Sequence, residues 1–323
     1  MQILFFLLNI WIGVEFWLFV EAMEHPTARP PVERPAGVEG WLPIAGLMSF
    51  RYLLETGYSP GVHPAALFLF MAFLTTSLLL RKAFCSWLCP VGTVSEWLWK
   101  FGRSTFRRNW APPRWLDIVL RSLKYILLGL FVWAVWGMSA LAIEQFLKSP
   151  YGMVADVKML NFFRHMTVTS AVVIGILMIG SIFVKNLWCR YLCPYGALQG
   201  LAALLSPLKI RRNKELCIDC GKCAKACPSL LPVDQLVQVR SAECLGCLEC
   251  IESCPRENAL VFALPAPPKR AWYPVRPWQV AAAVCFIFVA FVGYAKATGQ
   301  WDTVIPEALY RELIANAWHY SHP

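Results

Sequence analysis

The sequence predicts a mainly α-helical membrane protein, a helical bundle with a small cysteine-rich α+β domain inserted before its last helix. Three observations support this fold class. The 323 residues are 58% hydrophobic and only 15% charged, which is too apolar for a soluble domain of this length. Five long runs carry almost no charge, and twelve of the 13 cysteines fall in four short motifs. We expect a membrane domain at 1–208, the inserted domain at 209–264, a proline-rich connector with the last helix at 265–299, and an outward-facing tail at 300–323.

Each of the five apolar runs is close to the roughly 20 residues that a helix needs to cross a hydrocarbon core. The first run is apolar apart from two glutamates and has neither a basic n-region nor a small-residue cleavage site, so we expect a retained membrane helix. The other four runs contain no Lys, Arg, Asp or Glu. We therefore predict about five transmembrane helices, at 1–21, 56–80, 125–143, 165–184 and 277–295.

The distribution of charge predicts the orientation. With five spans, one side of the membrane receives 81–124 and 185–276, which hold 22 of the 30 Lys and Arg residues. The positive-inside rule makes this side cytoplasmic. Topology then explains the net charge of +10, so we expect no nucleic acid partner. The predicted location is a bacterial cytoplasmic membrane, crossed several times, with the inserted domain in the cytoplasm.

Three segments outside the spans have a distinct composition. Proline-rich stretches at 25–37 and 265–277 are expected to be extended connectors. Near the C-terminus, Glu307–Tyr320 is amphipathic, and we expect it to lie at the outer surface of the membrane.

Two runs of four cysteines share the spacing C-x2-C-x2-C-x3-C-P, at 217–228 and 244–255. This spacing is typical of bacterial two-cluster ferredoxins, in which the fourth cysteine of each run ligates the other cluster. Zinc sites usually use separated cysteine pairs, and disulfides require an oxidising compartment. We therefore predict two [4Fe-4S] clusters, the first held by Cys217, Cys220, Cys223 and Cys254, and the second by Cys244, Cys247, Cys250 and Cys227.

A second motif, C-x3-C-P-x-G, occurs at the ends of the second and fourth predicted spans, with the copies 104 residues apart. This indicates an internal repeat of a two-helix unit. The paired cysteines, at i and i+4, share one face of a helical turn. They could converge on a third iron–sulfur cluster, act as redox thiols or metal-binding pairs, or only pack the helix ends. The four cysteines of this motif are Cys85, Cys89, Cys189 and Cys193.

The combination of two C-x3-C-P motifs with a two-cluster ferredoxin domain resembles the membrane polyferredoxins of the NapH, NosR and YccM type. The oxidase assembly protein CcoG shares the same parts. The longest outward loop, of about 35 residues, has no room for the additional flavin domain of NosR-type members, so the NapH and YccM group is the better match. The resemblance implies electron transfer at the cytoplasmic membrane, between the quinone pool or a cytoplasmic donor and periplasmic redox proteins.

Three further residues are candidates for quinone binding or proton transfer. Glu15 lies within the first predicted span, where an ionisable side chain suggests a function, although it could also be hydrated at the interface. His63 and His165 lie near the starts of the second and fourth spans. They could ligate a shared haem, bind a quinone or cap the helices.

The sequence contains no Gly-rich phosphate loop, dinucleotide fingerprint or nucleophile triad. We therefore expect an electron-transfer subunit of an oxidoreductase complex rather than a stand-alone enzyme. Its expected partners are other subunits of a membrane redox complex, such as a periplasmic cytochrome or iron–sulfur protein, with a quinone or a cytoplasmic protein as donor. Two alternatives are an assembly factor that reduces copper for a respiratory enzyme, and a redox sensor.

Overall fold

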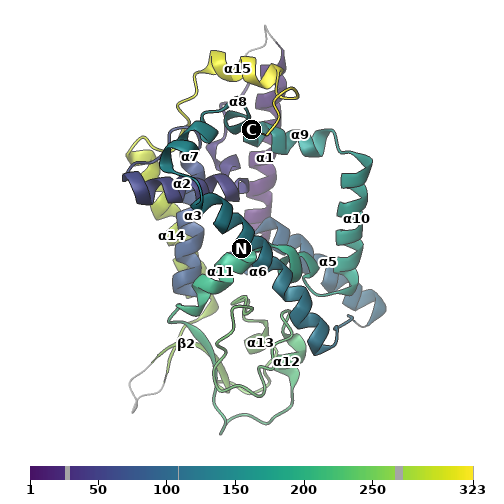
Figure 1. Cartoon of the computed structure of the whole chain (residues 1–323). Coiled ribbons are helices and arrows are strands. Elements are labelled where there is room, and N and C mark those ends of the chain that lie inside the picture. Colours follow the sequence, from purple (N-terminus) through teal and green to yellow (C-terminus); the bar gives the residue numbers. More distant parts are fainter. Residues whose placement is uncertain (26–29, 108, 266–271, 323) are drawn as a thin grey trace. The chain divides into compact units, whose positions relative to one another are not determined.

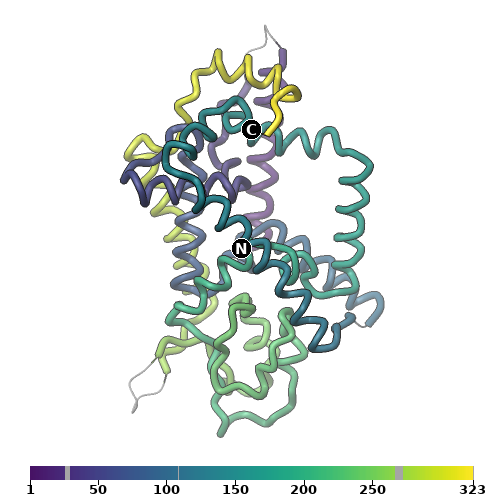
Figure 2. The backbone as a smooth tube through the Cα atoms, viewed as in Figure 1, coloured from purple at the N-terminus to yellow at the C-terminus, as the bar shows by residue number. Residues whose placement is uncertain are grey.

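The computed structural model describes residues 1–25, 30–107, 109–265 and 272–322 (Figures 1 and 2). The chain forms two compact units. The first unit contains 1–6, 73–128 and 174–287, and the second contains 7–72, 129–173 and 288–323. The proline-rich connectors predicted at 25–37 and 265–277 include 26–29 and 266–271, which lie outside the described residues.

Within the described residues, three helices are long and apolar enough to cross a membrane. They are α1 (Gln2–Glu24), α6 (Arg114–Trp136) and α14 (Pro277–Ala297). A fourth span is formed if α9 (Ala155–Arg164) and α10 (Val168–Phe183), which meet at a bend of 82°, are counted together. The protein is therefore a mainly helical membrane protein with three to four candidate spans.

Three predicted spans differ from the helices observed. The expected helix at 165–184 is α10, of 16 residues, which is long enough to span only when it is counted together with α9. The expected helix at 56–80 is only α3 (Pro64–Leu80), of 17 residues, because Gly57 adopts φ 76° and ends the preceding α2 (Pro43–Thr56). The helix expected at 125–143 is observed as α6, which both begins and ends earlier in the sequence, at Arg114–Trp136. Its first turns carry charges that a charge-free criterion excludes from a span, and protein groups pair three of those charges, as described below. At its end, Ser139 caps the next helix, α7 (Ala140–Leu147), by accepting a hydrogen bond from the backbone N–H of Ala142.

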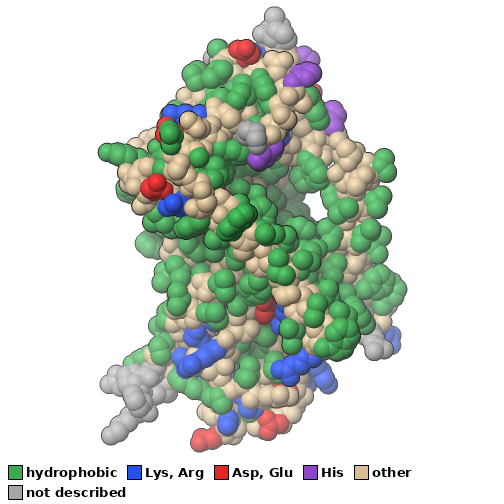
Figure 3. All heavy atoms as spheres, viewed as in Figure 1, with side chains coloured by type: hydrophobic (Ala, Val, Ile, Leu, Met, Phe, Trp, Pro, Cys, Tyr) green, Lys and Arg blue, Asp and Glu red, His purple; other side chains and the backbone are tan. Residues whose placement is uncertain are grey.

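Helix α10 shows how these helices present apolar surface. Five branched aliphatic side chains along it are 51–81% exposed, and the space-filling view shows a hydrophobic surface over this helix (Figure 3). A large contiguous apolar surface marks a contact with lipid or another protein. The five are Val168, Val172, Val173, Ile176 and Ile179.

The first unit contains a three-stranded antiparallel sheet in the order β1-β2-β3. Strand β1 (Lys209–Arg212) pairs with β2 (Leu260–Leu264), which pairs with β3 (Tyr273–Pro274). The other short elements of this unit are α4 (Ala83–Trp87), α5 (Pro90–Phe106), a single π-helical turn η2 (Trp188–Leu192), α11 (Pro194–Leu204), α12 (Lys222–Ala226) and α13 (Glu249–Glu252).

The core of the second unit joins the C-terminal helix to α1. The predicted amphipathic tail forms α15 (Glu307–Ala315), and its apolar face is buried rather than spread on a surface, with Leu313 and Ile314 packed in one cluster with Phe16 and Val20 of α1. The ring of Tyr310 stacks on Phe19 at 6.1 Å. Two short elements complete this unit, the 3-10 helix η1 (Ala36–Trp41) and α8 (Pro150–Met153).

Candidate functional site

The first cysteine run curls around a cavity because two of its residues adopt the left-handed backbone conformation. Asp219 has φ 49° and Gly221 has φ 66°, and the equivalent residues of the second run, Gly246 and Leu248, both have φ 66°. Glycine tolerates this conformation, whereas a branched residue such as Leu248 adopts it only under constraint. The two loops therefore have left-handed residues at the same two positions, and this backbone conformation turns the first three thiols of each run to the same side.

The eight ferredoxin cysteines line two separate small cavities. One is lined by three cysteines of the first run and the fourth of the second, and the other by the converse set. These are the two sets that the spacing predicts as ligands. The sets are Cys217, Cys220, Cys223 and Cys254, and Cys227, Cys244, Cys247 and Cys250.

The surroundings of these thiols fit an iron–sulfur cluster. Burial raises the pKa of Cys227, Cys247 and Cys250 above the ordinary thiol value. A buried thiolate is therefore unfavourable until a metal neutralises it. Among the described residues, no three Cys, His, Asp or Glu side chains are close enough to hold a single metal ion. Each set thus surrounds a space, as the corners of a cubane require.

The four C-x3-C-P cysteines also come together. Burial raises the pKa of Cys189 well above its ordinary value, and the charges of Cys193, Cys89 and Cys85 raise it further. Burial likewise raises the pKa of Cys85 to about 12 and that of Cys89 to about 11. Of the three roles considered for these cysteines, this convergence favours a shared ligand set.

Each copy of the repeat places its second cysteine at the N-terminus of a helix. Cys89 precedes α5 and Cys193 precedes α11, each followed by a proline at the first helical position. The backbone N–H of Gly196 donates a hydrogen bond to Cys193 Sγ at 3.2 Å. The N–H of Gly92 lowers the pKa of Cys89, against the larger effect of burial. Both helix ends therefore favour negative charge on sulfur.

One small cavity is lined by residues of this set and of the second ferredoxin set. Cys85 and Cys189 line it together with Cys247, and the ring of Trp99 closes part of its wall. Cysteines of the C-x3-C-P set and of the second ferredoxin set therefore line the same cavity inside the first unit.

Side chains near the C-x3-C-P motifs hold the ferredoxin loops through backbone carbonyls. Ser86 Oγ donates to the carbonyl of Leu245 at 3.0 Å, and Trp87 Nε1 donates to that of Gly246 at 3.2 Å. Basic residues that we interpreted as orientation signals have the same role. Their bonds are Arg81 to Ser241, Arg121 to Ser229, Lys185 to Lys225 and Arg190 to Pro228.

Ion pairs involve three of the four charged residues at the start of α6, namely Asp117, Arg121 and Lys124. Arg190 Nη2 lies 2.7 Å from Asp117 Oδ1. Lys124, fully buried, donates to Glu243 Oε2 at 2.6 Å, while Tyr125 donates to the other oxygen at 2.8 Å. Buried charges require such partners. The pairs explain why α6 includes residues that a charge-free criterion excludes.

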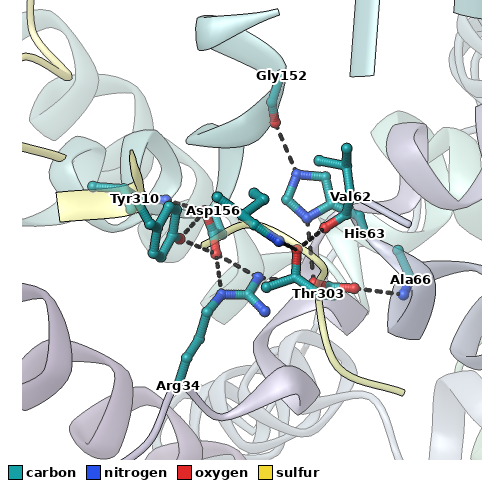
Figure 4. A network of polar contacts seen from close by, with 11 residues as sticks. Arg34, Val62, His63, Ala66, Gly152, Asp156, Thr303 and Tyr310 are labelled. Carbon is teal, nitrogen blue, oxygen red and sulfur yellow. Dashed lines mark hydrogen bonds and ion pairs between the residues drawn. The ribbon is translucent and has the colours of Figure 1, made fainter. Parts of the chain in front are cut away.

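In the second unit, His63 belongs to a buried polar network that the sequence did not predict (Figure 4). Its Nε2 lies 2.8 Å from the carbonyl of Gly152, and its Nδ1 lies 3.3 Å from Glu39 Oε1. Both partners are acceptors, so the protonated ring, which has two N–H donors, satisfies both contacts. Burial lowers the pKa of His63, but the hydrogen bond and the charge of Glu39 outweigh it and leave the pKa raised.

Arg34 joins the two acids of this network. Its guanidinium binds Asp156 through Nε at 3.1 Å and Nη2 at 2.7 Å, and Glu39 at 2.8 Å. Tyr310 donates to Asp156 at 2.8 Å, and Glu39 Oε2 accepts the N–H of Ala66 in the first turn of α3. With His63 protonated, two cations and two anions balance, and the network connects η1, α3, α9 and α15.

The remaining predicted candidates have different surroundings. Glu15 lines an open, polar cavity of the second unit with Arg34, Lys296 and Trp301. His165 is exposed and lies edge-on to Trp318 at 5.0 Å. The two histidines that we considered for a shared haem have no common partner among the described contacts, because both nitrogens of His63 are engaged elsewhere.

Comparison with known proteins agrees with the cysteine sites. A family model described as a 4Fe-4S binding domain matches twice, at 62–109 and at 166–213, so each copy of the repeat is recognised separately. A second model, described as a 4Fe-4S dicluster domain, matches 209–255. No solved structure matches the chain.

Three relatives place the chain more closely. YccM of Escherichia coli (strain K12), named as an electron transport protein, is 52% identical over 99% of this chain and 90% of its own length. NirI of Paracoccus denitrificans is 30% identical over 66% of this chain and 31% of its own length. The ferredoxin-type protein NapH of Escherichia coli is 23% identical over 55% and 60%, respectively.

The helices, the cysteine cavities and these matches define a membrane-bound iron–sulfur electron-transfer protein that binds [4Fe-4S] clusters. The chain belongs to the YccM-like family of electron transport proteins, to which NapH, NosR and NirI are related.

Proposed function

We propose that the chain is the electron-transfer subunit of a membrane redox complex. It relays single electrons between the quinone pool or a cytoplasmic donor and a partner redox protein, such as a periplasmic cytochrome or iron–sulfur protein. When bound, a [4Fe-4S] cluster accepts and gives up one electron. The protein supplies the thiols and positions them around the cavities.

In this proposal the two ferredoxin clusters have crossed ligands. One cluster is held by three thiols of the first run and by Cys254, and the other by three thiols of the second run and by Cys227. The grouping of these thiols around two cavities supports this assignment.

A third iron–sulfur centre, at the four C-x3-C-P cysteines, extends the relay. The observation that carries this proposal is the cavity bordered by Cys85, Cys189 and Cys247, because it adjoins the second ferredoxin set. The match of a 4Fe-4S binding model to each copy of the repeat supports it as well.

The proposed topology keeps the five spans, with α3 and the bent α9–α10 pair as two of them, and the ferredoxin domain in the cytoplasm. The excess of basic residues in 81–124 and 185–276 supports this orientation. The domain boundaries proposed are those given above, with the ferredoxin domain at 209–264. Glu15 remains the candidate for quinone or proton chemistry, since the donors Arg34, Lys296 and Trp301 line the same cavity.

The test is a double substitution, Cys85→Ser with Cys189→Ser, in anaerobically purified protein. We expect iron per chain to fall by about four, with the loss of one EPR signal during reductive titration. Cys285→Ser is the matched control, because Cys285 is an exposed cysteine of α14 outside the three sets. Unchanged iron and spectra in the double variant would refute the third centre and favour a thiol or metal-transfer role for these cysteines.

A further inference from the structure

Lys82 is a buried cation that lies three residues before the first cysteine of the first C-x3-C-P motif. It is the residue that precedes α4, and it is 1% exposed. In the described part of the chain its ammonium group has neither an ion pair nor a hydrogen bond. An ammonium group that leaves water without a compensating anion costs several kcal/mol. A fully buried lysine of this kind therefore indicates that negative charge is present nearby in the functional protein.

The neighbouring acid supplies charge for only one of two lysines, because Glu243 interacts electrostatically with both Lys124 and Lys82. Glu243 is the carboxylate near Lys82, but Lys124 and Tyr125 occupy its two oxygens at 2.6 and 2.8 Å. Two lysines and one glutamate thus leave an excess of one positive charge. The arrangement is incomplete as long as the adjacent thiols are neutral.

The groups that face Lys82 are the C-x3-C-P cysteines. The backbone carbonyl of Lys82 accepts a hydrogen bond from the N–H of Cys85 at 3.1 Å, and the charge of Lys82 favours the thiolate form of Cys85 and Cys189. Other cations serve the ferredoxin sets, since Lys185 acts on Cys227 and Arg212 lies 3.5 Å from Cys217 Sγ. Each region of cysteine ligands therefore has a cation of its own.

We propose that Lys82 compensates the charge of an anionic iron–sulfur centre held by Cys85, Cys89, Cys189 and Cys193, and thereby sets its reduction potential. The inference rests on the third centre of the proposed function. A cubane with four thiolate ligands carries net negative charge, and reduction adds one more. A fixed positive charge beside it stabilises the reduced state more than the oxidised state, which raises the potential.

The test compares Lys82→Met and Lys82→Arg by EPR-monitored redox titration. We expect Lys82→Met to lower the potential of one centre, the one that disappears in the Cys85→Ser, Cys189→Ser variant. The two ferredoxin centres should keep their potentials. Lys82→Arg, which keeps the charge, should remain close to the unsubstituted protein. Lys185→Met is the matched control, and should shift the centre that contains Cys227 instead.

Iron content separates the two ways in which the proposal can fail. If the unsubstituted protein holds only about eight iron atoms, the third centre of the proposed function is absent and the role of Lys82 falls with it. If it holds about twelve and Lys82→Met leaves all potentials unchanged, the third centre stands and the role of Lys82 is refuted. Lys82→Gln, which retains a polar side chain, decides the question if Lys82→Met does not fold.

Discussion

The two glycines of the C-x3-C-P-x-G motifs allow a matched comparison within one chain. A Cβ added at Gly92 would overlap the carbonyl oxygen of Cys85, a backbone atom that cannot move without displacing the cysteine itself. A Cβ added at Gly196 would meet nothing closer than Cys193 Sγ at 3.5 Å, which is an ordinary contact. We therefore expect Gly92→Ala to disturb the first copy of the motif and Gly196→Ala to be tolerated.

The magnitude follows from two opposing terms. Replacing glycine by alanine in a helix gains up to about 1 kcal/mol of stability, whereas forcing an extra carbon into a packed region costs about 1–3 kcal/mol. At Gly196 only the gain applies. At Gly92 the overlap is with backbone, so we expect the upper part of the cost, a net loss of about 1–2 kcal/mol.

The assay is thermal unfolding in detergent, followed by tryptophan fluorescence, together with iron per chain for each variant. Gly92→Ala should unfold at a lower temperature and lose the iron of the third centre first. Gly196→Ala should match or exceed the unsubstituted protein in both measurements. Equal behaviour of the two variants would refute the reasoning, because their local helical setting is the same and only the space differs.

Three further predictions concern the buried charges. Because the pKa of His63 is raised in the folded state, its stabilising effect is fully present below about pH 6.5 and is lost as pH rises through the folded-state pKa. The melting temperature should therefore fall with rising pH, and His63→Gln should make this fall smaller. An unchanged dependence of melting temperature on pH in the variant would contradict a protonated His63. Glu243→Gln leaves Lys124 unpaired, so we expect a loss of about 3–5 kcal/mol in denaturant unfolding, and a loss below 1 kcal/mol would contradict it. Tyr310→Phe removes the hydrogen bond to Asp156, so it should lower the free energy of unfolding by about 1–2 kcal/mol and increase proteolysis of α15. Unaltered cleavage would show that this hydroxyl does not hold the helix.

The cysteine sites could be predicted from the sequence because their determinants are local. Spacing alone placed Cys254 with the first three cysteines and Cys227 with the last three, and the structure gathers the same sets around its two cavities. The internal repeat can also be predicted from the sequence, because both copies carry the C-x3-C-P-x-G motif, and a family model matches each copy. Short motifs carry this information because the cysteine spacing and the left-handed residues that shape each loop lie within the loop itself.

The charged interactions could not be predicted in this way. Lys124 and Glu243 are 119 residues apart, and Arg34 and Asp156 are 122 apart. No periodicity or motif links such pairs, because tertiary packing brings them together. The start of α6 was misplaced for the same reason. A criterion that allows no charge ends the predicted span at the first charged residue, even where the folded protein pairs that charge and the helix continues.

The measurement that tests the central claim most directly is iron and acid-labile sulfide per chain in anaerobically purified, unsubstituted protein. Three centres in one relay predict about twelve iron and twelve sulfide per chain, with three EPR-active species on reduction. A value of about eight would leave only the ferredoxin clusters, and would contradict a relay that continues through Cys85, Cys89, Cys189 and Cys193.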